Sequence, residues 1–143
     1  MAGTLTVANS SIQMTTEALY TTAQRLQGYA TDDAFTTEAV ENGEYYMGID
    51  GKLSAGFVFN EIPLTLTFQA DSDSLLLFEN IWQYEVTNRT KLGQAITIAI
   101  PDLKRRYDFT QGFMRSYKAP EGKKILQPAV VAFVFGRMKA SPL

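Results

Sequence analysis

The segment Ile62-Pro63-Leu64-Thr65-Leu66-Thr67-Phe68-Gln69 decides the fold class of this chain. Leu64, Leu66 and Phe68 alternate with neutral polar residues, so a strand here places apolar groups on one face and hydroxyl or amide groups on the other. Asp71-Ser72-Asp73-Ser74 follows almost at once, and its short polar side chains and negative charge suit the start of a helix. The sequence therefore predicts a half-buried strand that leads directly into a helix.

The predicted helix runs from Leu75 to about Tyr84. Its apolar residues recur at helical spacing and form a wide stripe made of Leu75, Leu77, Phe78, Ile81 and Trp82. We interpret this stripe, Trp82 included, as the face with which the helix covers a sheet.

Further strands are predicted on both sides of this unit. In 94–100, isoleucines alternate with small residues until Pro101, which has no amide proton to continue a ladder. The run 129–135 is apolar on both faces, as expected of a strand that is central in a sheet or lies at an interface. Weaker signals mark strands near 11–16, 26–29, 39–47 and 53–59. Mainly β structure with one helix follows.

Two dipeptides that tolerate positive φ, Asn42-Gly43 and Asp50-Gly51, predict chain reversals. Between them lies Glu44-Tyr45-Tyr46-Met47-Gly48-Ile49. Two interpretations remain open for this segment: its side chains fold back onto the core, or they form a contact surface.

Composition limits the possible functions. The chain has 143 residues, of which 45% are hydrophobic, and no linker or repeat divides it, so we expect a single domain over 1–143 with an N-terminal arm over about 1–16. Thirteen Lys and Arg against fifteen Asp and Glu give a net charge of −2, which argues against a protein that grips a phosphate backbone. With neither Cys nor His, common metal and nucleophile chemistry is excluded, and we expect no metal and no cofactor.

Carboxylate pairs are the acid and base machinery that remains, as Asp71 with Asp73 or Glu41 with Glu44. The first pair is explained by the helix start and the second by a turn, so we expect no enzymatic activity. A basic cluster, Lys104-Arg105-Arg106, is bracketed by Asp102 and Asp108, which indicates a solvated face or an ion-paired subunit boundary.

The order of these features resembles that of a known family. Gly51-Lys52-Leu53, the strand at 62–67, the helix start at Asp71-Ser72 and the strand ending Ile100-Pro101 are followed by Tyr107-Asp108-Phe109-Thr110-Gln111-Gly112-Phe113, Pro120-Glu121-Gly122-Lys123-Lys124 and Gln127-Pro128. Over about residues 38–138 the chain resembles the tail tube proteins of tailed bacteriophages, especially contractile ones, which are related to the tube subunits of type VI secretion.

The resemblance implies a β-sandwich or partly open barrel with one flanking helix. It also implies a structural virion protein: six copies form a ring, and rings stack into the tube through which DNA is ejected into the host. The implied partners are further copies of the chain, a sheath protein, the baseplate hub, a tape-measure protein and a terminator, with non-specific passage of DNA. The implied location is the virion tail, after synthesis in the bacterial cytoplasm, and no membrane insertion is expected.

A tube for DNA makes physical demands that assign residues. The wall of the lumen must not hold phosphates, because each cation there would act as a brake. The lumen-facing candidates are Thr65, Thr67, Gln69, Gln94 and Thr97. Tyr and Met suit protein contacts, so the candidates for contact between rings are Glu44, Tyr45, Tyr46, Met47 and Ile49, with Leu5–Thr16 as a second arm. Lys104, Arg105 and Arg106 are candidates for an intersubunit or sheath-facing site.

Two other functions stay open at this point. A small carbohydrate-binding β-sandwich would use Tyr45, Tyr46 and Trp82 as sugar platforms, although Trp82 falls on the stripe expected to be buried. A small carboxylate-based hydrolase would need a concave pocket with two acidic groups of raised pKa.

Overall fold

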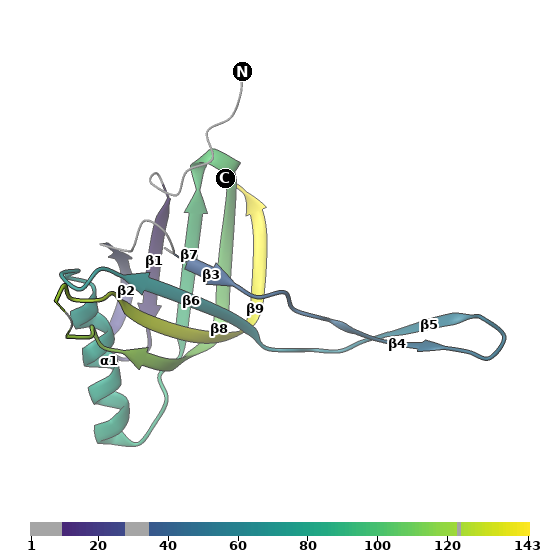
Figure 1. Ribbon diagram of the computed structural model, residues 1–143, viewed down its shortest axis with the longest axis horizontal. Coiled ribbons are helices and arrows are strands. Elements are labelled where there is room, and N and C mark those ends of the chain that lie inside the picture. The colour runs from purple at the N-terminus through teal and green to yellow at the C-terminus, as the bar shows by residue number, and fades with distance from the viewer. Residues whose placement is uncertain (1–9, 28–34, 123) are drawn as a thin grey trace.

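The computed structural model describes residues 10–27, 35–122 and 124–143. Within them the chain forms nine β-strands, one α-helix and one short 3-10 helix (Figure 1). Their bounds are β1 (Ser11–Thr16), β2 (Tyr20–Leu26), β3 (Phe35–Thr37), β4 (Gly43–Met47), β5 (Leu53–Phe57), β6 (Ile62–Phe68), α1 (Leu75–Asn88), β7 (Gln94–Ile100), η1 (Pro101–Leu103), β8 (Arg105–Lys118) and β9 (Ala129–Pro142).

Seven strands form one folded sheet in the order β2-β1-β7-β8-β9-β6-β3, with antiparallel pairing throughout. The long strands β8 and β9 belong to both halves of it. We call β2, β1, β7 and the parts 105–110 of β8 and 137–142 of β9 the first layer. The second layer consists of 112–118 of β8, 129–135 of β9, β6 and β3. The sheet is sandwich-like and does not close into a barrel.

The passage of β8 from one layer to the other depends on two adjacent residues. Gln111 adopts a left-handed conformation with φ 57°. At Gly112 a Cβ atom would lie 2.1 Å from the ring of Phe135, which no real side chain tolerates. Glycine therefore allows β9 to pack closely where β8 changes layers.

The hydrophobic core lies between the two layers. The first layer contributes alternating residues such as Ile96 and Ile98, which are almost fully buried. The second contributes Leu64, Leu66 and Phe68, the apolar face that their alternation predicts. The rings of Phe109 and Phe135 lie 5.3 Å apart, where β8 and β9 are paired.

Helix α1 begins at the predicted residue, Leu75, and extends to Asn88. Its buried residues are Leu75, Phe78, Ile81 and Glu85. Phe78 packs against Phe68 of β6 and Phe133 of β9, with ring centroids 5.1 and 6.0 Å away. The prediction that Trp82 is part of the buried stripe is wrong, since Trp82 is 41% exposed. It follows Ile81 by one residue, about 100° around the helix, and so leaves the core-facing side.

Strands β4 and β5 form a separate two-stranded hairpin that projects far from the sandwich (Figure 1). The predicted reversal at Asp50-Gly51 is confirmed, with Gly51 at φ 84°. The predicted reversal at Asn42-Gly43 is wrong: Gly43 begins β4 and pairs with Phe57. The dipeptide lies at the base of the hairpin, where the chain continues outward.

Most other expectations are confirmed. The strand predicted at 94–100 is β7, and the run 129–135 opens β9, which is central between β8 and β6. Residues 1–9 of the expected N-terminal arm lie outside the described residues, as do residues 28–29 of a predicted strand. Ser11–Thr16, however, is paired with strands on both sides and is no free arm. In the described part of the chain, α1 is too short and too polar to span a membrane.

Candidate self-assembly surfaces

The hairpin presents apolar side chains to solvent on both strands. Tyr45, Tyr46 and Met47 are 63%, 70% and 67% exposed, so the alternative in which this segment folds back onto the core is wrong. Ile49 at the tip and Leu53 on β5 are also exposed, and we call these five residues the hairpin surface. An isolated two-stranded ribbon is marginally stable in water. Exposed aromatic and Met side chains on such a ribbon are typical of a surface that contacts another protein.

The tip of the hairpin is held by local hydrogen bonds. The Gly48 N–H donates to the Lys52 carbonyl at 2.8 Å, and the Gly51 N–H donates to the Gly48 carbonyl at 2.9 Å. Asp50 Oδ1 accepts from the Lys52 N–H at 3.1 Å. The turn is therefore formed without a partner, which lowers the entropy lost when the surface docks.

The two layers differ in how their edges are covered. In the second layer, helix α1 lies against the second half of β8. Lys91 Nζ, just after the helix, donates to the Met114 carbonyl at 2.7 Å, and Glu79 accepts from the Tyr117 hydroxyl at 3.1 Å. In the first layer, no strand of the described chain pairs with the outer side of β2 or with the side of residues 137–142 that faces away from β8. Only the first layer therefore combines two open edges of similar length.

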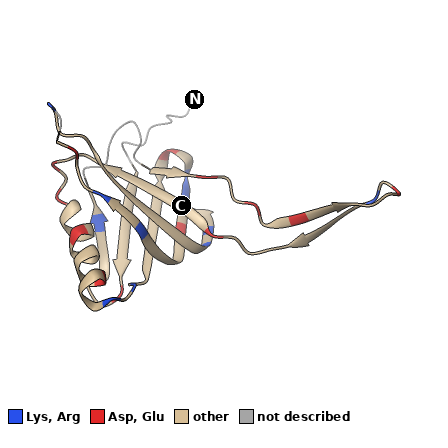
Figure 2. Cartoon of the chain, turned by 60° about the horizontal axis from the view of Figure 1, so that its bottom comes forward, with Lys and Arg blue, Asp and Glu red and all other residues tan. Residues whose placement is uncertain are grey.

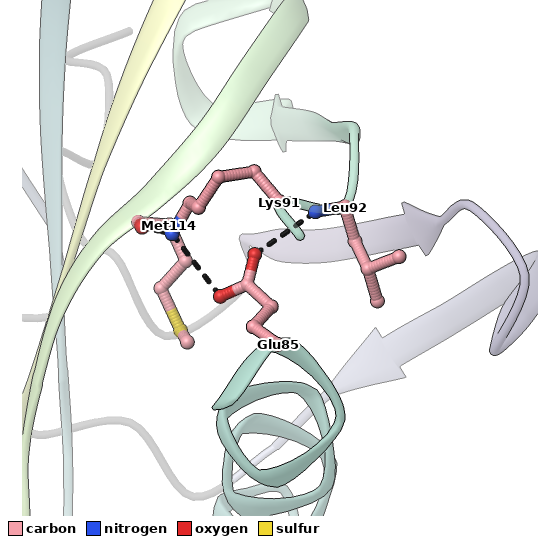
Figure 3. A network of polar contacts seen from close by, with 4 residues as sticks. All are labelled: Glu85, Lys91, Leu92 and Met114. Carbon is pink, nitrogen blue, oxygen red and sulfur yellow. Dashed lines mark hydrogen bonds and ion pairs between the residues drawn. The ribbon is translucent and has the colours of Figure 1, made fainter. Parts of the chain in front are cut away.

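A buried carboxylate holds α1 against the sheet (Figure 3). Glu85 is 7% exposed and accepts two hydrogen bonds, from Lys91 Nζ at 3.1 Å and from the Leu92 N–H at 2.9 Å. Since Lys91 also binds Met114, the three residues link the end of the helix, the loop after it and β8. The desolvation cost of Glu85 is offset by an ion pair and a backbone donor.

The phenol of Tyr117 takes part in the same contact between helix and strand. Partial burial raises its pKa to about 12, and the hydrogen bond to Glu79 and the negative charge of that carboxylate act in the same direction. Tyr117 therefore stays neutral at neutral pH and acts as a donor to α1.

A groove of about 960 Å³ lies where the hairpin leaves the sandwich. One side consists of the base of the hairpin and the other of β8 and the second half of β9. The groove is lined by Thr37, Glu38, Val40, Glu41, Asn42, Phe57, Val58, Phe59, Asn60, Ile62, Asp108, Thr110, Gly136, Arg137, Met138 and Lys139. Figure 2 shows acidic residues along the connection to the hairpin. Apolar and charged groups thus meet beside an open strand edge.

The five lumen candidates do not share a face. Thr97 points outward from the first layer and donates to Asp108 Oδ1 at 2.8 Å. Thr65 and Thr67 point outward from the second layer, and Gln69 is exposed beyond the end of β6. A single wall cannot contain all of these residues.

Gln94 is a misassigned lumen candidate. It is 3% exposed, and its Oε1 accepts from the Thr16 hydroxyl at 2.7 Å. The reason is the two-residue period of a strand: Gln94 is in phase with Ile96 and Ile98, so it points into the core.

The basic cluster lies at the start of β8. Lys104 ends η1 in a left-handed conformation, and Arg105 and Arg106 are exposed. Arg106 pairs with Asp108 at 3.2 Å, one of the neighbours that bracket the cluster in sequence. Asp71 and Asp73 are exposed in the turn before α1, and Glu41 and Glu44 are exposed near the hairpin.

Some surface residues escaped sequence reasoning. Phe57 and Phe59 are exposed in the groove, and Arg137 and Lys139 lie on β9 beyond the apolar run. The alternation of aromatics around Val58 and of cations around Met138 is the signal that could have marked them. Trp82 and the hairpin tyrosines lie on different parts of the molecule, with α1 and the hairpin on opposite sides of the sandwich, so they do not form a common platform (Figure 1).

Comparisons with known proteins agree with this architecture. The model of a family described as "Tail fiber protein gp32" matches residues 3–138. Three solved structures are similar at 9–10% identity. A chain of the sheath/tube terminator of PVC, an extracellular contractile injection system, has a TM-score of 0.71 and 10% identity, over 99% of both chains. A chain of the PVC sheath-tube complex has a TM-score of 0.65 and 10% identity, over 92% of this chain and 88% of that one.

The third similar structure is a chain of the anti-feeding prophage baseplate, with a TM-score of 0.58 and 9% identity, over 99% of this chain and 98% of that one. No curated protein matches the sequence. The fold is therefore that of tube-type proteins of contractile injection systems, and the predicted mainly β, sandwich-like class with one flanking helix is confirmed.

Proposed function

The chain belongs to the family described as "Tail fiber protein gp32" and is thus a structural tail protein, and from this premise we propose that it is a subunit of the tail tube. Six copies would form a ring, and stacked rings would form the channel for DNA ejection in the virion. The observation that carries the proposal is the first layer, whose two open edges would both be paired in a closed ring.

The size of such a ring suits a DNA channel. The first layer contributes five strands per copy. At about 4.8 Å between strands, six copies give a circumference of roughly 144 Å and a backbone diameter of roughly 46 Å, before side chains and strand tilt are counted. Residue chemistry supports this layer as the wall of the bore. Its outward face carries short neutral side chains at Gln13, Thr15, Ala95, Thr97 and Ala99.

The cations near this wall need a partner if they are not to hold DNA. Arg106 lies on the same face and has one in Asp108. Thr65, Thr67 and Gln69 would then lie away from the bore. We keep Lys104 and Arg105 as candidates for an intersubunit or sheath contact, because they lie at one end of the layer, where η1 leads into β8.

The hairpin surface is the proposed contact between rings, with Glu44 at its polar side. The similar structures come from complexes titled as sheath, tube, terminator and baseplate, which supports a sheath, a baseplate hub and a terminator as partners. A tape-measure protein inside the tube follows from the same proposal.

Imaging of the purified protein by negative-stain electron microscopy tests the proposal. We expect rings with six-fold symmetry that stack into hollow tubes as concentration rises. Monomers at high concentration, confirmed by sedimentation, would contradict it.

A ring that caps the tube is a second candidate, because a chain from a terminator structure matches over 99% of both chains. The same images separate the two functions. A tube subunit gives tubes whose length increases with concentration, whereas a capping ring stays a single ring or pairs of rings.

A further inference from the structure

We infer that the groove beside β9 is the acceptor for strand β2 of the neighbouring copy, so that copies join by strand addition. The inference rests on the proposed assembly into rings and names the contact that would close them. Strand addition to an open edge supplies backbone hydrogen bonds, while the groove around it selects the side chains.

The acceptor is an opening within the sheet itself. Strand β6 pairs with the first half of β9, from Ala129 to Phe135, where Ile62 is its partner. Beyond Phe135, β9 continues along β8, whereas the chain before Ile62 turns away toward the hairpin. The groove fills the angle between them, with Gly136–Lys139 on one side and Phe57–Asn60 on the other. An incoming strand would take the position that β6 gives up.

Strand β2 has the properties that this position requires. It is the other open edge of the same layer, and it has seven residues, Tyr20–Leu26. Thr21, Thr22 and Ala23 are exposed and short, so they can enter a groove without displacing the core. Because donor and acceptor are different edges, the contact is head to tail, which is the kind that generates rings.

The strand directions add a specific expectation. Each neighbouring pair from β2 through β1, β7 and β8 to β9 is antiparallel. The first and fifth strands of this series therefore run in the same direction. Rotation about the axis of a ring preserves that direction, so β2 would pair with β9 of the next copy in parallel.

Charge selects a second copy as the occupant. Arg25 carries the one charge of β2, and it is exposed. Glu38 and Glu41 line the groove, and neither forms an ion pair with any residue that the structure describes. The docked β2 would bring a cation to this acidic side of the groove, which favours the correct partner and register.

Cross-linking tests the contact directly, because the chain has no cysteine. Ala23→Cys on β2 and Ser141→Cys on β9 are small changes on outward faces of the two edge strands, and both are made in the same chain. A short bis-maleimide tolerates a shift of one residue pair in register. We expect a ladder from dimer to hexamer on a denaturing gel. Ala23→Cys combined with Gln83→Cys, which is exposed on α1, is the matched control and should give no ladder.

The outcomes separate this inference from the proposed function when the same samples are imaged. Rings or tubes without a ladder would overturn the β2 contact and leave the tube proposal intact, and would point to a different occupant of the groove. A ladder from particles that never close into rings would support the strand contact and overturn the ring. Monomers without a ladder would overturn both.

A charge exchange provides an independent measurement. Arg25→Glu should raise the concentration needed for half-assembly by roughly tenfold. Adding Glu38→Lys and Glu41→Lys should recover most of that loss, whereas Lys124→Glu, on an exposed loop, should have little effect. Equal effects of Arg25→Glu and Lys124→Glu would contradict the assigned pairing.

Discussion

Glu85 illustrates how a single residue on the core face of a helix can be charged. Its position in the sequence, one turn after Ile81, predicts burial, and the sequence gives no sign of the partners that make burial possible. Those partners, Lys91 and the Leu92 N–H, come from the loop that follows. A pattern of helical spacing cannot identify them, because they depend on how the chain turns after Asn88.

Glu85→Ala should lower the free energy of unfolding by about 2–3 kcal/mol, since it removes a charge-assisted bond and leaves the buried Leu92 N–H without an acceptor. Glu85→Gln keeps one acceptor oxygen and should cost about half as much. Urea denaturation followed by far-ultraviolet circular dichroism measures both. Asp71→Asn, on an exposed turn, serves as the control and should change stability by less than about 0.5 kcal/mol. A stable Glu85→Ala protein would show that the network does not anchor α1.

Tyr117 predicts the response of the fold to alkaline pH. Its pKa in the folded state is about 12, above the ordinary value of 10.0. Between these two values the unfolded chain releases the phenolic proton while the folded chain retains it, so stability falls as pH rises from about 10 to 12. Below pH 10 this contribution is fully present.

Comparison of wild type with Tyr117→Phe isolates that contribution. The absorbance difference at alkaline pH should show one tyrosine that titrates near pH 12, and the variant should lose less stability between pH 10 and 12 than the wild type. Tyr45→Phe, on the exposed hairpin, is the control. Identical alkaline unfolding of wild type and Tyr117→Phe would contradict the assignment.

At the scale of elements, alternation predicts strands well but assigns their ends less securely. Strands β6, β7 and the first half of β9 follow from a two-residue period. Gln94 was misassigned because its polarity was given more weight than its phase with Ile96, and Trp82 because a helical stripe was drawn one residue too wide. Both errors concern residues at the margin of an apolar pattern, where tertiary contacts decide.

The hairpin is the element whose function can be tested most simply. Replacing Tyr45 and Tyr46 together by Ser removes exposed apolar area but no core contact, so the subunit should fold with a thermal midpoint close to that of the wild type. Assembly into long tubes should be lost or shifted to much higher concentration. Negative-stain images and sedimentation measure this, and Lys52→Ser at the hairpin turn is the control. Normal long tubes from the double variant would refute the inter-ring role.

At the scale of the whole molecule, the element order predicts the fold class, while the arrangement of layers does not follow from it. The bend of β8 at Gln111 and Gly112 and the exposed edges beside β2 and β9 arise from long-range pairing. For this reason sequence reasoning gathered Thr65, Thr67 and Thr97 on one wall, whereas the bend places them on opposite sides of the sandwich. The surfaces that matter for assembly are properties of the folded sheet.

The division of these threonines between two outward faces gives a prediction for the assembled tube. If the first layer lines the bore, Thr97→Cys in long tubes should react with a small maleimide but be protected from a bulky polyethylene glycol maleimide, which enters only at tube ends. Thr65→Cys, on the second layer, should react with both. The cysteine-free background makes the labelling specific, and disassembled subunits provide the control in which both variants react fully. The reverse pattern would place the second layer at the bore and require that β6 and the first half of β9, not β1 and β7, face the DNA.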